Sequence, residues 1–365
     1  MECGVCTGSC PVAMDLEGFS PRNMIKRTLG EEENRFIMSK DIWACLSCSR
    51  CSDRCPVGID FPAFIRTFRK KARQAGNLPQ LSHHGMFHTI TNIQATGLRQ
   101  NRRQWAEQAG RISEKGEYFY FTGCIAYYNA AFKYLDLDMI DSAKNNIFML
   151  NRLGIEPVVS NDECCCGHDA FWSGDDETFK KLAAQNLEAI AASGAKTVIF
   201  GCPEGYSMFR EAYSEEFGPL PFEIMHITQF LAERLENSGI GFSDREGRTI
   251  TFQDPCRLGR RSGVFDAPRK LLELVQGARL EEMEHNRENA ICCGTTAWME
   301  CSSCSKAMQK KRLDEAKQTG AQILVTACPK CQIHLTCAKK NTDQDIEIMD
   351  LGSFLAANIK QDTEK

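Results

Sequence analysis

From residue 117 onward, short apolar segments alternate with longer amphipathic ones. Residues 117–124 (EYFYFTGC) are apolar and end at a cysteine, and residues 134–153 repeat apolar side chains at helical spacing until Gly154. Strands that alternate with helices in this way predict parallel β-sheet with right-handed crossover connections. The same alternation returns in the second half of the chain. We therefore expect two α/β lobes.

The two halves correspond element by element, down to the tails EIMHITQFLA from Glu223 and EIMDLGSFLA from Glu347. We expect two pseudo-symmetric lobes with parallel sheets, related by a pseudo-two-fold axis and joined by the glycine-containing linker at residues 236–248. In the first copy the expected strands are 117–124, 156–160 and 197–203, and the helices 134–153 and 178–192. In the second copy the expected strands are 248–256 and 322–331, and the helices 267–275 and 304–319.

The first 75 residues follow helical periodicity. Residues 21–40 and 61–74 each place apolar side chains at helical spacing among charges, which predicts one amphipathic helix in each segment. We interpret the basic face of the second helix as solvated rather than as a docking surface. The apolar positions are Met24, Ile25, Leu29, Phe36 and Ile37 in the first segment and Phe61, Phe64, Ile65 and Phe68 in the second, and the outward basic positions are Arg66, Arg69, Lys70, Lys71 and Arg73.

A polar, glycine-rich connector separates this helical part from the lobes. It contains His83, His84 and His88. No cysteine or carboxylate pattern accompanies these histidines, so we expect them in interdomain packing or at the surface rather than on a metal. The expected domains are residues 1–75, the connector 76–116, the first repeat at 117–236 and the second repeat at 247–360.

Composition narrows the class of protein. The chain of 365 residues is long enough for two or three domains. Its net charge of −4 favours neither nucleic acid nor an anionic membrane surface, and no apolar run approaches the ~20 residues of a membrane-spanning helix. No secretory signal precedes the 20 cysteines, which favours metal ligation over disulfides. We expect a cytoplasmic protein whose membrane association, if any, comes through a partner.

One cysteine motif has a specific chemical meaning. Residues 45–56 read CLSCSRCSDRCP, with the spacing C-x2-C-x2-C-x3-C-P by which bacterial-type ferredoxins hold a [4Fe–4S] cluster. The alternative is a zinc site made of two C-x2-C pairs. Zinc knuckles usually separate such pairs by a dozen or more residues, so we favour iron and sulfur.

A second cysteine motif near the N-terminus has the same spacing but lacks one cysteine. Residues 3–11 read C-x2-C-x3-C-P. Three explanations stay open: a start further upstream, a different fourth ligand, or a three-iron [3Fe–4S] cluster. Ligation in two-cluster ferredoxins is crossed between motifs. Crossed ligation would give one complete cluster on Cys10, Cys45, Cys48 and Cys51, and an incomplete one on Cys3, Cys6 and Cys55.

In each lobe the cysteines follow expected strands. Open α/β sheets bind ligands at the carboxyl ends of their strands, so dispersed cysteines could meet there. Gly205 stands where the first copy would have a fifth cysteine. A four-iron cube needs only four ligands, so a fifth implies a different cluster. The first copy offers Cys124, Cys165, Cys166 and Cys202, and the second offers Cys256, Cys292, Cys293, Cys328 and Cys331.

The other cysteines and the arginines after Cys256 are less specific. Cys164 could replace Cys165 as a ligand. Arg257, Arg260 and Arg261 could clamp an anionic substrate group through fork-shaped hydrogen bonds, or they could be surface residues at a helix start. We interpret Cys301, Cys304 and Cys337 as free buried thiols.

The cysteine pattern, with CCG at its centre and C-x2-C at its end, resembles the repeat of heterodisulfide reductases. The N-terminal motifs resemble the ferredoxin-type C subunit of that family. The chain thus resembles a fusion of the C and B subunits, which is the layout of the membrane-linked D subunit. The most specific parts are residues 4–11, 254–260 and 328–331.

The resemblance implies two ferredoxin-type [4Fe–4S] clusters and a non-cubane [4Fe–4S] cluster on the five cysteines of the second copy. In that family such a cluster binds a disulfide and cleaves it in two one-electron steps. Two departures matter. Arg257 stands where related chains often have histidine, which leaves the proton donor open. Because Gly205 replaces the fifth cysteine, three alternatives stay open for the first copy: a second non-cubane cluster with a substitute ligand, an ordinary cube, or no cluster.

These observations lead to three hypotheses of function. The first is an iron–sulfur oxidoreductase subunit for disulfide or thiol chemistry within a larger complex. Its electrons would come from a flavin-containing subunit like the A subunit of heterodisulfide reductase, or from a membrane cytochrome. The second is a pure electron relay with no substrate of its own. The third is a zinc-based interaction module.

Overall fold

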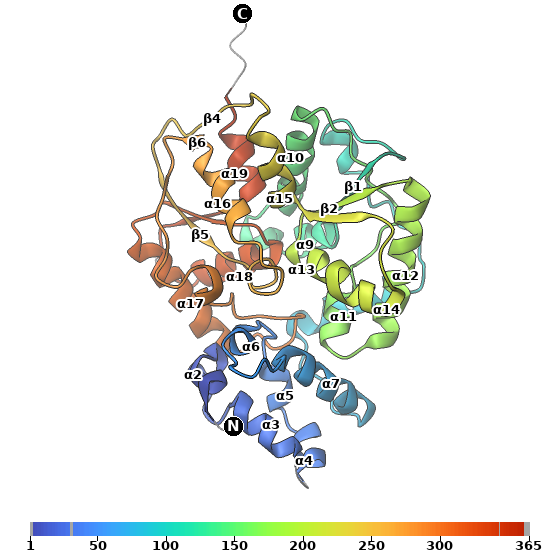
Figure 1. Ribbon diagram of the computed structural model, residues 1–365, viewed down its shortest axis with the longest axis vertical. Coiled ribbons are helices and arrows are strands. Elements are labelled where there is room, and N and C mark those ends of the chain that lie inside the picture. Colours follow the sequence, from blue (N-terminus) through green and yellow to red (C-terminus); the bar gives the residue numbers. More distant parts are fainter. Residues whose placement is uncertain (1–2, 30–31, 343, 361–365) are drawn as a thin grey trace, which may run out of the picture.

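The computed structural model describes residues 3–29, 32–342 and 344–360 and consists of a helical N-terminal domain set against two α/β lobes (Figure 1). In Figure 1 the N-terminal helices, in blue, lie below the two lobes. Lobe one follows the connector, and lobe two occupies the C-terminal part of the chain. The sequence-based prediction of helical and α/β parts is therefore confirmed at the level of fold class.

Each lobe is built on a parallel sheet, as the alternation of strands and helices predicts. The order is β1-β2-β3 in lobe one and β7-β5-β8-β9 in lobe two, and every pairing is parallel. The strands are β1 (Tyr118–Phe121), β2 (Thr197–Phe200), β3 (Glu223–His226), β5 (Thr249–Gln253), β7 (Arg279–Leu280), β8 (Ile323–Thr326) and β9 (Glu347–Asp350), and β4 (Phe242–Ser243) pairs with β6 (Val275–Gln276) in a small parallel sheet near the linker.

One expected strand is reduced to a single residue. Residues 156–160 form no named strand, and only Val158 bridges to Phe119 and Ser113. Val158 still exchanges backbone hydrogen bonds with the neighbouring strand, through Tyr118 and Tyr120. Pro157 stands next to it, and a proline has no N–H to extend the ladder. The edge of sheet one is therefore shorter than expected.

Helices cover the sheets and begin where cysteines end the strands. Several longer helices start at side-chain caps. The carboxylate of Asp138 accepts a hydrogen bond from the N–H of Asp141, and that of Asp175 accepts one from the N–H of Thr178. The lobe helices are α9 (Ile125–Ala131), α10 (Met139–Arg152), α11 (His168–Trp172), α12 (Asp176–Ser193), α13 (Pro203–Met208), α14 (Ser214–Phe217), α15 (Ile227–Leu235), α16 (Asp266–Glu273), α17 (Ser303–Gln318), α18 (Pro329–Lys339) and α19 (Leu351–Ala357).

The N-terminal domain differs from the expectation in its first long segment. Residues 21–40 hold two helices, and Leu29, expected on the buried face, is 82% exposed. The Thr28 hydroxyl donates back to the carbonyl of Ile25, which closes the first of these helices. The helices are α1 (Val5–Gly8), α2 (Pro11–Asp15), α3 (Pro21–Thr28), α4 (Glu33–Ile37), α5 (Asp41–Ala44), α6 (Arg50–Asp53) and α7 (Phe61–Gln74).

Helix α7 has the predicted bounds, but its basic face is only partly solvated. Arg69 is fully buried, and Arg66 and Lys70 both pair with Asp176 at the start of α12. Arg73 pairs with Asp175, Nη2 to Oδ2 at 3.1 Å. The acidic cap of one helix attracts the basic face of another, so this face is the surface by which the N-terminal domain docks on lobe one.

The connector carries α8 (Met86–Gln94) and packs between the lobes, which matches the interdomain interpretation of its histidines. His88 Nε2 lies 2.8 Å from the carbonyl oxygen of Ala297 in lobe two. The His83 ring meets Trp298 edge-on at 5.5 Å between centroids. His84 is exposed.

Candidate iron–sulfur and thiol-redox site

The N-terminal domain gathers four cysteines around one small cavity. Cys10 stands just before α2, and Cys45, Cys48 and Cys51 lie on the loop between α5 and α6 and its first helical turn. All four are buried and line a cavity of about 20 Å³. Burial raises the pKa of the Cys10 thiol to about 12. Four thiols around one cavity form the donor set that a [4Fe–4S] cluster requires, and they are the set that crossed ligation predicts.

The remaining three cysteines of this domain are less enclosed. Cys3 is exposed, and Cys6 and Cys55 are half-buried. Helix α1 packs on α6, which ends just before Cys55, so the two segments lie side by side. The structure thus brings the segments together without burying their thiols.

Lobe one gathers its four cysteines at the carboxyl ends of its strands. Cys124, Cys165, Cys166 and Cys202 line a second cavity of about 20 Å³, with Gly205 in its wall. The Cys165 thiol lies close to those of Cys124 and Cys166, which lower its pKa. Cys124, Cys202 and the Cys165–Cys166 pair each come just before a helix, which places the sulfurs near helix N-termini.

Cys164 does not take the place of Cys165. Its thiol donates to the carbonyl oxygen of Leu182 at 3.4 Å, and it does not line the cavity of lobe one that holds the other four cysteines. Burial raises the pKa of this thiol well above its usual value. Cys164 therefore belongs to the packing against α12.

Gly205 occupies the position in α13 that Cys331 occupies in α18. A Cβ added at Gly205 would lie 3.2 Å from Cδ1 of Phe200 and 3.7 Å from Cδ1 of Phe121. These two rings are paired across β1 and β2, with centroids 5.2 Å apart. The same register positions in lobe two hold Gln253 and Thr326. Aromatic rings in lobe one thus fill the space beside the position of the fifth cysteine.

Lobe two brings its five cysteines into one chain of contacts. The thiols of neighbouring members lie close enough to shift one another's pKa. Cys292 and Cys331 lower the pKa of the Cys293 thiol to about 6. This chain of contacts continues into lobe one, where Cys202 lies beside Cys328. Its members in lobe two are Cys256, Cys292, Cys293, Cys331 and Cys328, of which all but the half-buried Cys256 are buried.

Arginines after Cys256 join the N-terminal domain to this group. Arg260 Nε donates to the carbonyl of Cys48 at 2.7 Å, and Nη1 donates to the carbonyl of Ala290 at 2.6 Å. Cys48 also lies close enough to Cys292 for their charges to interact. The four-cysteine cavity of the N-terminal domain therefore faces the cysteines of lobe two.

The same geometry argues against the arginines as a substrate clamp. Arg257 is buried, donates from Nη1 to the carbonyl of Ser47 at 2.8 Å and from Nε to Nε2 of His168 at 3.2 Å, and lies over the Trp172 ring. Arg261 pairs with Glu211. These side chains bind protein groups, and of the Arg257 nitrogens only the buried Nη2 has no hydrogen-bond partner and is left for a substrate contact.

Sequence reasoning missed a buried ionic group between the lobes. Lys330 Nζ lies 2.5 Å from Oδ1 of Asp169 and 2.8 Å from Oε2 of Glu204, and His168 Nδ1 lies 2.9 Å from the same Asp169 oxygen. Burial lowers the pKa of His168 to about 3, so this histidine is neutral. The lysine supplies the cation that the two carboxylates require. The sequence signal that could have revealed this group was the position of its members, because Lys330 stands between two cysteines and His168 follows the CCCG run.

The cysteines outside these sets differ in exposure from the expectation. Cys301 is exposed rather than buried, because it precedes the cap of α17 on the surface. Cys304 is buried, and Cys337 is half-buried with its sulfur 3.3 Å from Nζ of Lys306.

Comparison with known proteins agrees with this arrangement. The model of a cysteine-rich domain family matches residues 118–210 and 250–336, and that of a 4Fe–4S dicluster domain matches residues 1–59. The D subunit of the dihydromethanophenazine:CoB–CoM heterodisulfide reductase of Methanosarcina barkeri is 29% identical over 98% of the chain and 92% of its own length. The chain is therefore similar to heterodisulfide reductase D subunits over nearly its whole length.

More distant relatives are also redox proteins. The EtfAB:quinone oxidoreductase of Syntrophomonas wolfei is 26% identical over 87% of the chain and 46% of its own length. The B subunit of the fumarate reductase (CoM/CoB) of Methanothermobacter marburgensis is 24% identical over 97% of the chain and 71% of its own length. Together with the heterodisulfide reductases, these relatives place the chain among iron–sulfur oxidoreductase subunits.

A solved structure shares the fold. A hypothetical protein from Helicobacter pylori superimposes with a TM-score of 0.60 at 11% identity, over 94% of the chain and 67% of its own. This likeness concerns the fold alone. Within the described residues, no helix has the length and apolar character needed to cross a membrane.

Proposed function

We propose that this heterodisulfide reductase relative carries electrons from ferredoxin-type [4Fe–4S] clusters to a non-cubane cluster in lobe two, for disulfide or thiol chemistry within a larger complex. The observation that supports this most is the docking of the Cys48 loop against the five-cysteine chain of lobe two. When bound, such clusters supply electrons one at a time and an iron position that a substrate sulfur can reach.

In this proposal the cysteines would hold the clusters and Arg260 would position them. Cys10, Cys45, Cys48 and Cys51 would hold the complete cluster of the N-terminal domain, and Cys3, Cys6 and Cys55 the incomplete one. Arg260 would fix the distance between the docked loop and lobe two. The non-cubane cluster would be held by Cys256, Cys292, Cys293, Cys328 and Cys331.

Lobe one suits an ordinary cube better than a second non-cubane cluster. Its four cysteines line one cavity, and the Phe121–Phe200 pair occupies the space beside Gly205. The Cys202–Cys328 contact would place such a cube next to the lobe-two cluster. This arrangement favours one catalytic lobe and one lobe that relays electrons.

The electron donor would be a separate protein of the complex. A flavin-containing subunit or a membrane cytochrome fits a chain in which the entry clusters lie in an N-terminal domain at one end of the molecule (Figure 1). We propose a cytoplasmic location, with membrane association through such a partner.

A second function, pure electron relay, is favoured by the engaged arginines. Arg257, Arg260 and Arg261 bind protein groups, and Arg257 keeps one unpartnered nitrogen, Nη2, rather than a fork of two for an anion beside Cys256. In a relay, electrons would leave lobe two for another protein of the complex and no disulfide would be cleaved.

Disulfide turnover by a Cys256→Ser variant separates the two functions. Anaerobically purified protein is given reduced methyl viologen and bis(2-hydroxyethyl) disulfide. Two viologen electrons and two protons convert one disulfide into two thiols. We expect turnover by the native chain, loss of turnover in Cys256→Ser, and native turnover in the control Cys337→Ser, whose sulfur lies outside the cysteine sets.

Each other outcome has a definite meaning. Unchanged turnover in Cys256→Ser, or none in the native chain, would remove the catalytic role in favour of the relay. A colourless, iron-free preparation would exclude both and leave the zinc module. Iron and sulfide counts, with EPR of the oxidised protein after thiol addition, would complete the assignment.

A further inference from the structure

Three arginines are buried at the loop between α5 and α6. Arg69 is fully buried, and Arg50 and Arg257 are 5% and 3% exposed. Among the residues that the structure describes, no carboxylate forms an ion pair with any of the three. Glu300 and Glu315 act on Arg69 and Arg50 only from beyond ion-pair distance. Arginine keeps its proton at neutral pH even when buried, so the three are permanent charges.

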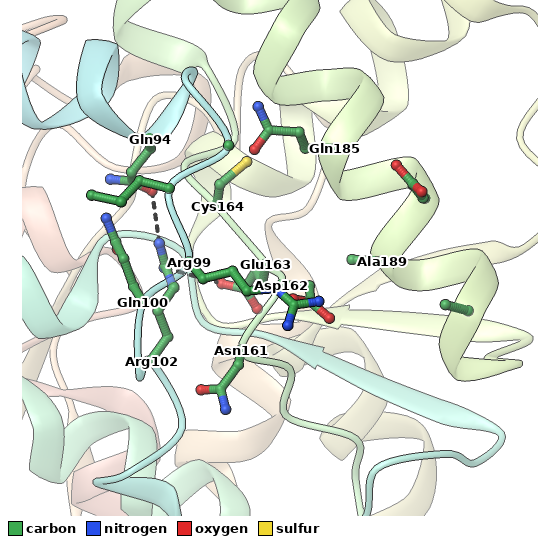
Figure 2. A pocket seen from close by; sticks show the side chains of 14 residues that line it. Gln94, Arg99, Gln100, Arg102, Asn161, Asp162, Glu163, Cys164, Gln185 and Ala189 are labelled. Carbon is green, nitrogen blue, oxygen red and sulfur yellow. Dashed lines mark hydrogen bonds and ion pairs between the residues drawn. The ribbon is translucent and has the colours of Figure 1, made fainter.

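The other buried arginines of the described chain each have an acidic partner. Arg102 pairs with Glu163, Nη2 to Oε1 at 3.5 Å, and both side chains line the pocket of lobe one that Figure 2 shows. Arg269 and Arg312 likewise pair with carboxylates in lobe two. A buried charge without an opposite charge is strongly destabilising, so such groups are normally paired or placed beside a metal. The three arginines without a carboxylate are exceptions that require another anion.

The protein binds these three cations through neutral groups. Arg69 donates to the carbonyl of Cys45 at 2.5 Å, and Arg257 reaches across from lobe two to donate to the carbonyl of Ser47 at 2.8 Å. Arg50 stands in the sequence between two cysteines of the motif. In the described structure, Nε of Arg50 and Nη2 of Arg257 are buried with no hydrogen-bond partner. These contacts fix the positions of the charges without neutralising them.

The cysteines of the loop lie within the field of these charges. Burial raises the pKa of the Cys45 thiol, and the charges of Arg69 and Arg257 oppose this rise. Arg50 and Cys48 are also close enough for their charges to interact. Cysteines ligate metals as thiolates, and four thiolates carry more negative charge than a [4Fe–4S] core offsets. Such a cluster would be the anion that the three arginines require.

We propose that the three arginines are the counter-charge of the cluster bound by Cys45, Cys48 and Cys51, and that they raise its midpoint potential. Reduction adds an electron to the cluster, so positive charge in a medium of low dielectric constant favours the reduced state. Arg257 comes from lobe two, so docking of the two domains supplies part of this effect. Electrons that enter the N-terminal domain would therefore collect on the cluster that faces lobe two. The presence of this cluster rests on the proposed function.

A potentiometric titration of the anaerobically purified full chain, followed by EPR, measures this effect. The signal that Cys48→Ser protein lacks identifies the cluster. We expect Arg50→Met and Arg257→Met each to make reduction of the cluster at least about tenfold less favourable, which lowers the midpoint potential by about 59 mV for one electron. Arg50→Lys and Arg257→Lys keep the positive charge and should recover at least about half of the shift.

An exposed arginine of the same domain provides the control. Arg35 lies on α4 with its side chain in solvent. Because water and salt screen its charge, Arg35→Met should leave the midpoint potential unchanged. Native potentials in both Arg50→Met and Arg257→Met would overturn the proposal, and so would equal decreases in the methionine and lysine variants.

Iron content keeps the test decisive where a methionine variant fails to assemble the cluster. Loss of iron in the methionine variant, with recovery in the matching lysine variant, would show that the cluster depends on the positive charge. Loss of iron in both variants would assign the arginine a structural role and overturn the proposal.

This inference and the proposed function fail in different measurements. The potentiometric titration contains no disulfide, so lack of turnover of bis(2-hydroxyethyl) disulfide leaves the predicted shifts unchanged. Conversely, native midpoint potentials in the variants would leave the disulfide chemistry of lobe two intact. An iron count made before the titration detects the one result that removes both, a chain without clusters.

Discussion

Arg260 of lobe two donates from Nε to the carbonyl oxygen of Cys48 in the N-terminal domain, at 2.7 Å. The same guanidinium reaches the carbonyl of Ala290, two residues before Cys292. One side chain thus ties a cysteine of the N-terminal cavity to the loop that carries cysteines of lobe two. The contact sets the spacing between the two groups of sulfurs.

Replacing Arg260 with glutamine should loosen this contact. Each charge-assisted bond contributes about 1.5–3 kcal/mol, so we expect a lower melting temperature and slower electron transfer from the N-terminal domain to lobe two. Calorimetry and stopped-flow reduction measure the two effects. The control Arg279→Gln removes an arginine that is 71% exposed and should change neither. A native melting temperature and native rate in Arg260→Gln would show that the contact does not hold the domains.

Crossed ligation in the N-terminal domain makes opposite predictions for two cysteines. Cys10 shares the buried cavity with Cys45, Cys48 and Cys51, whereas Cys55 is half-buried outside it. We expect Cys10→Ser to lose about one cluster of iron together with the EPR signal of the complete cube. Cys55→Ser should keep that signal. The reverse result would establish ligation within each motif.

The aromatic pair beside Gly205 predicts that a fifth cysteine cannot simply be restored. Gly205→Cys adds a Cβ 3.2 Å from the buried Phe200 ring and a sulfur beyond it, so it should lose about 1–3 kcal/mol of unfolding free energy. Gly205→Ala adds the Cβ alone and gains helix propensity in α13, so it should lose less. Neither should gain iron. The control Gly8→Ala adds a Cβ with no heavy atom within 4 Å and should cost little. A Gly205→Cys chain that is stable and richer in iron would contradict this account.

His226 predicts a component of acid sensitivity that comes from one buried ring beside Cys328. Burial lowers its pKa to about 3, so between pH 6.5 and 3 the unfolded chain binds a proton that the folded chain does not. Stability contributed by the neutral ring is therefore present above the ordinary pKa and is lost as pH falls. At pH 5.5 the loss is about 1.4 kcal/mol.

The variant His226→Asn isolates this effect. Its side-chain oxygen can still accept from the N–H of Thr228 as the native ring does, so the helix cap is kept. Denaturant unfolding at pH 7.5 and 5.5 should give a smaller decrease for the variant than for the native chain. Equal decreases in both proteins would assign the acid sensitivity to other groups.

Much of this architecture follows from local pattern. The alternation of apolar and amphipathic segments predicts parallel sheets, because each strand that pairs in parallel needs a crossover to return. The bounds of α7 match its apolar spacing, since Asp60 caps the N–H of Ala63 and buried phenylalanines repeat along one face. Spacing alone also predicts which four cysteines of the N-terminal domain lie together.

Other features depend on contacts between distant segments. Arg69 has the same local pattern as its solvated neighbours, but it is buried because the carbonyls of Ile42 and Trp172 lie around it. The ring of Phe200 beside Gly205 and the Lys330 group between the lobes arise only when separate strands and helices pack.

The sequence by itself determined the two lobes, the helical domain and the groups of cysteines that lie together, because periodicity and spacing are properties of neighbouring residues. Only the tertiary structure decided that the arginines after Cys256 join domains and that Arg50 and Arg69 are buried without a carboxylate partner among the described residues. Hydrogen-bond partners far apart in the chain settle these roles, and no local pattern specifies them.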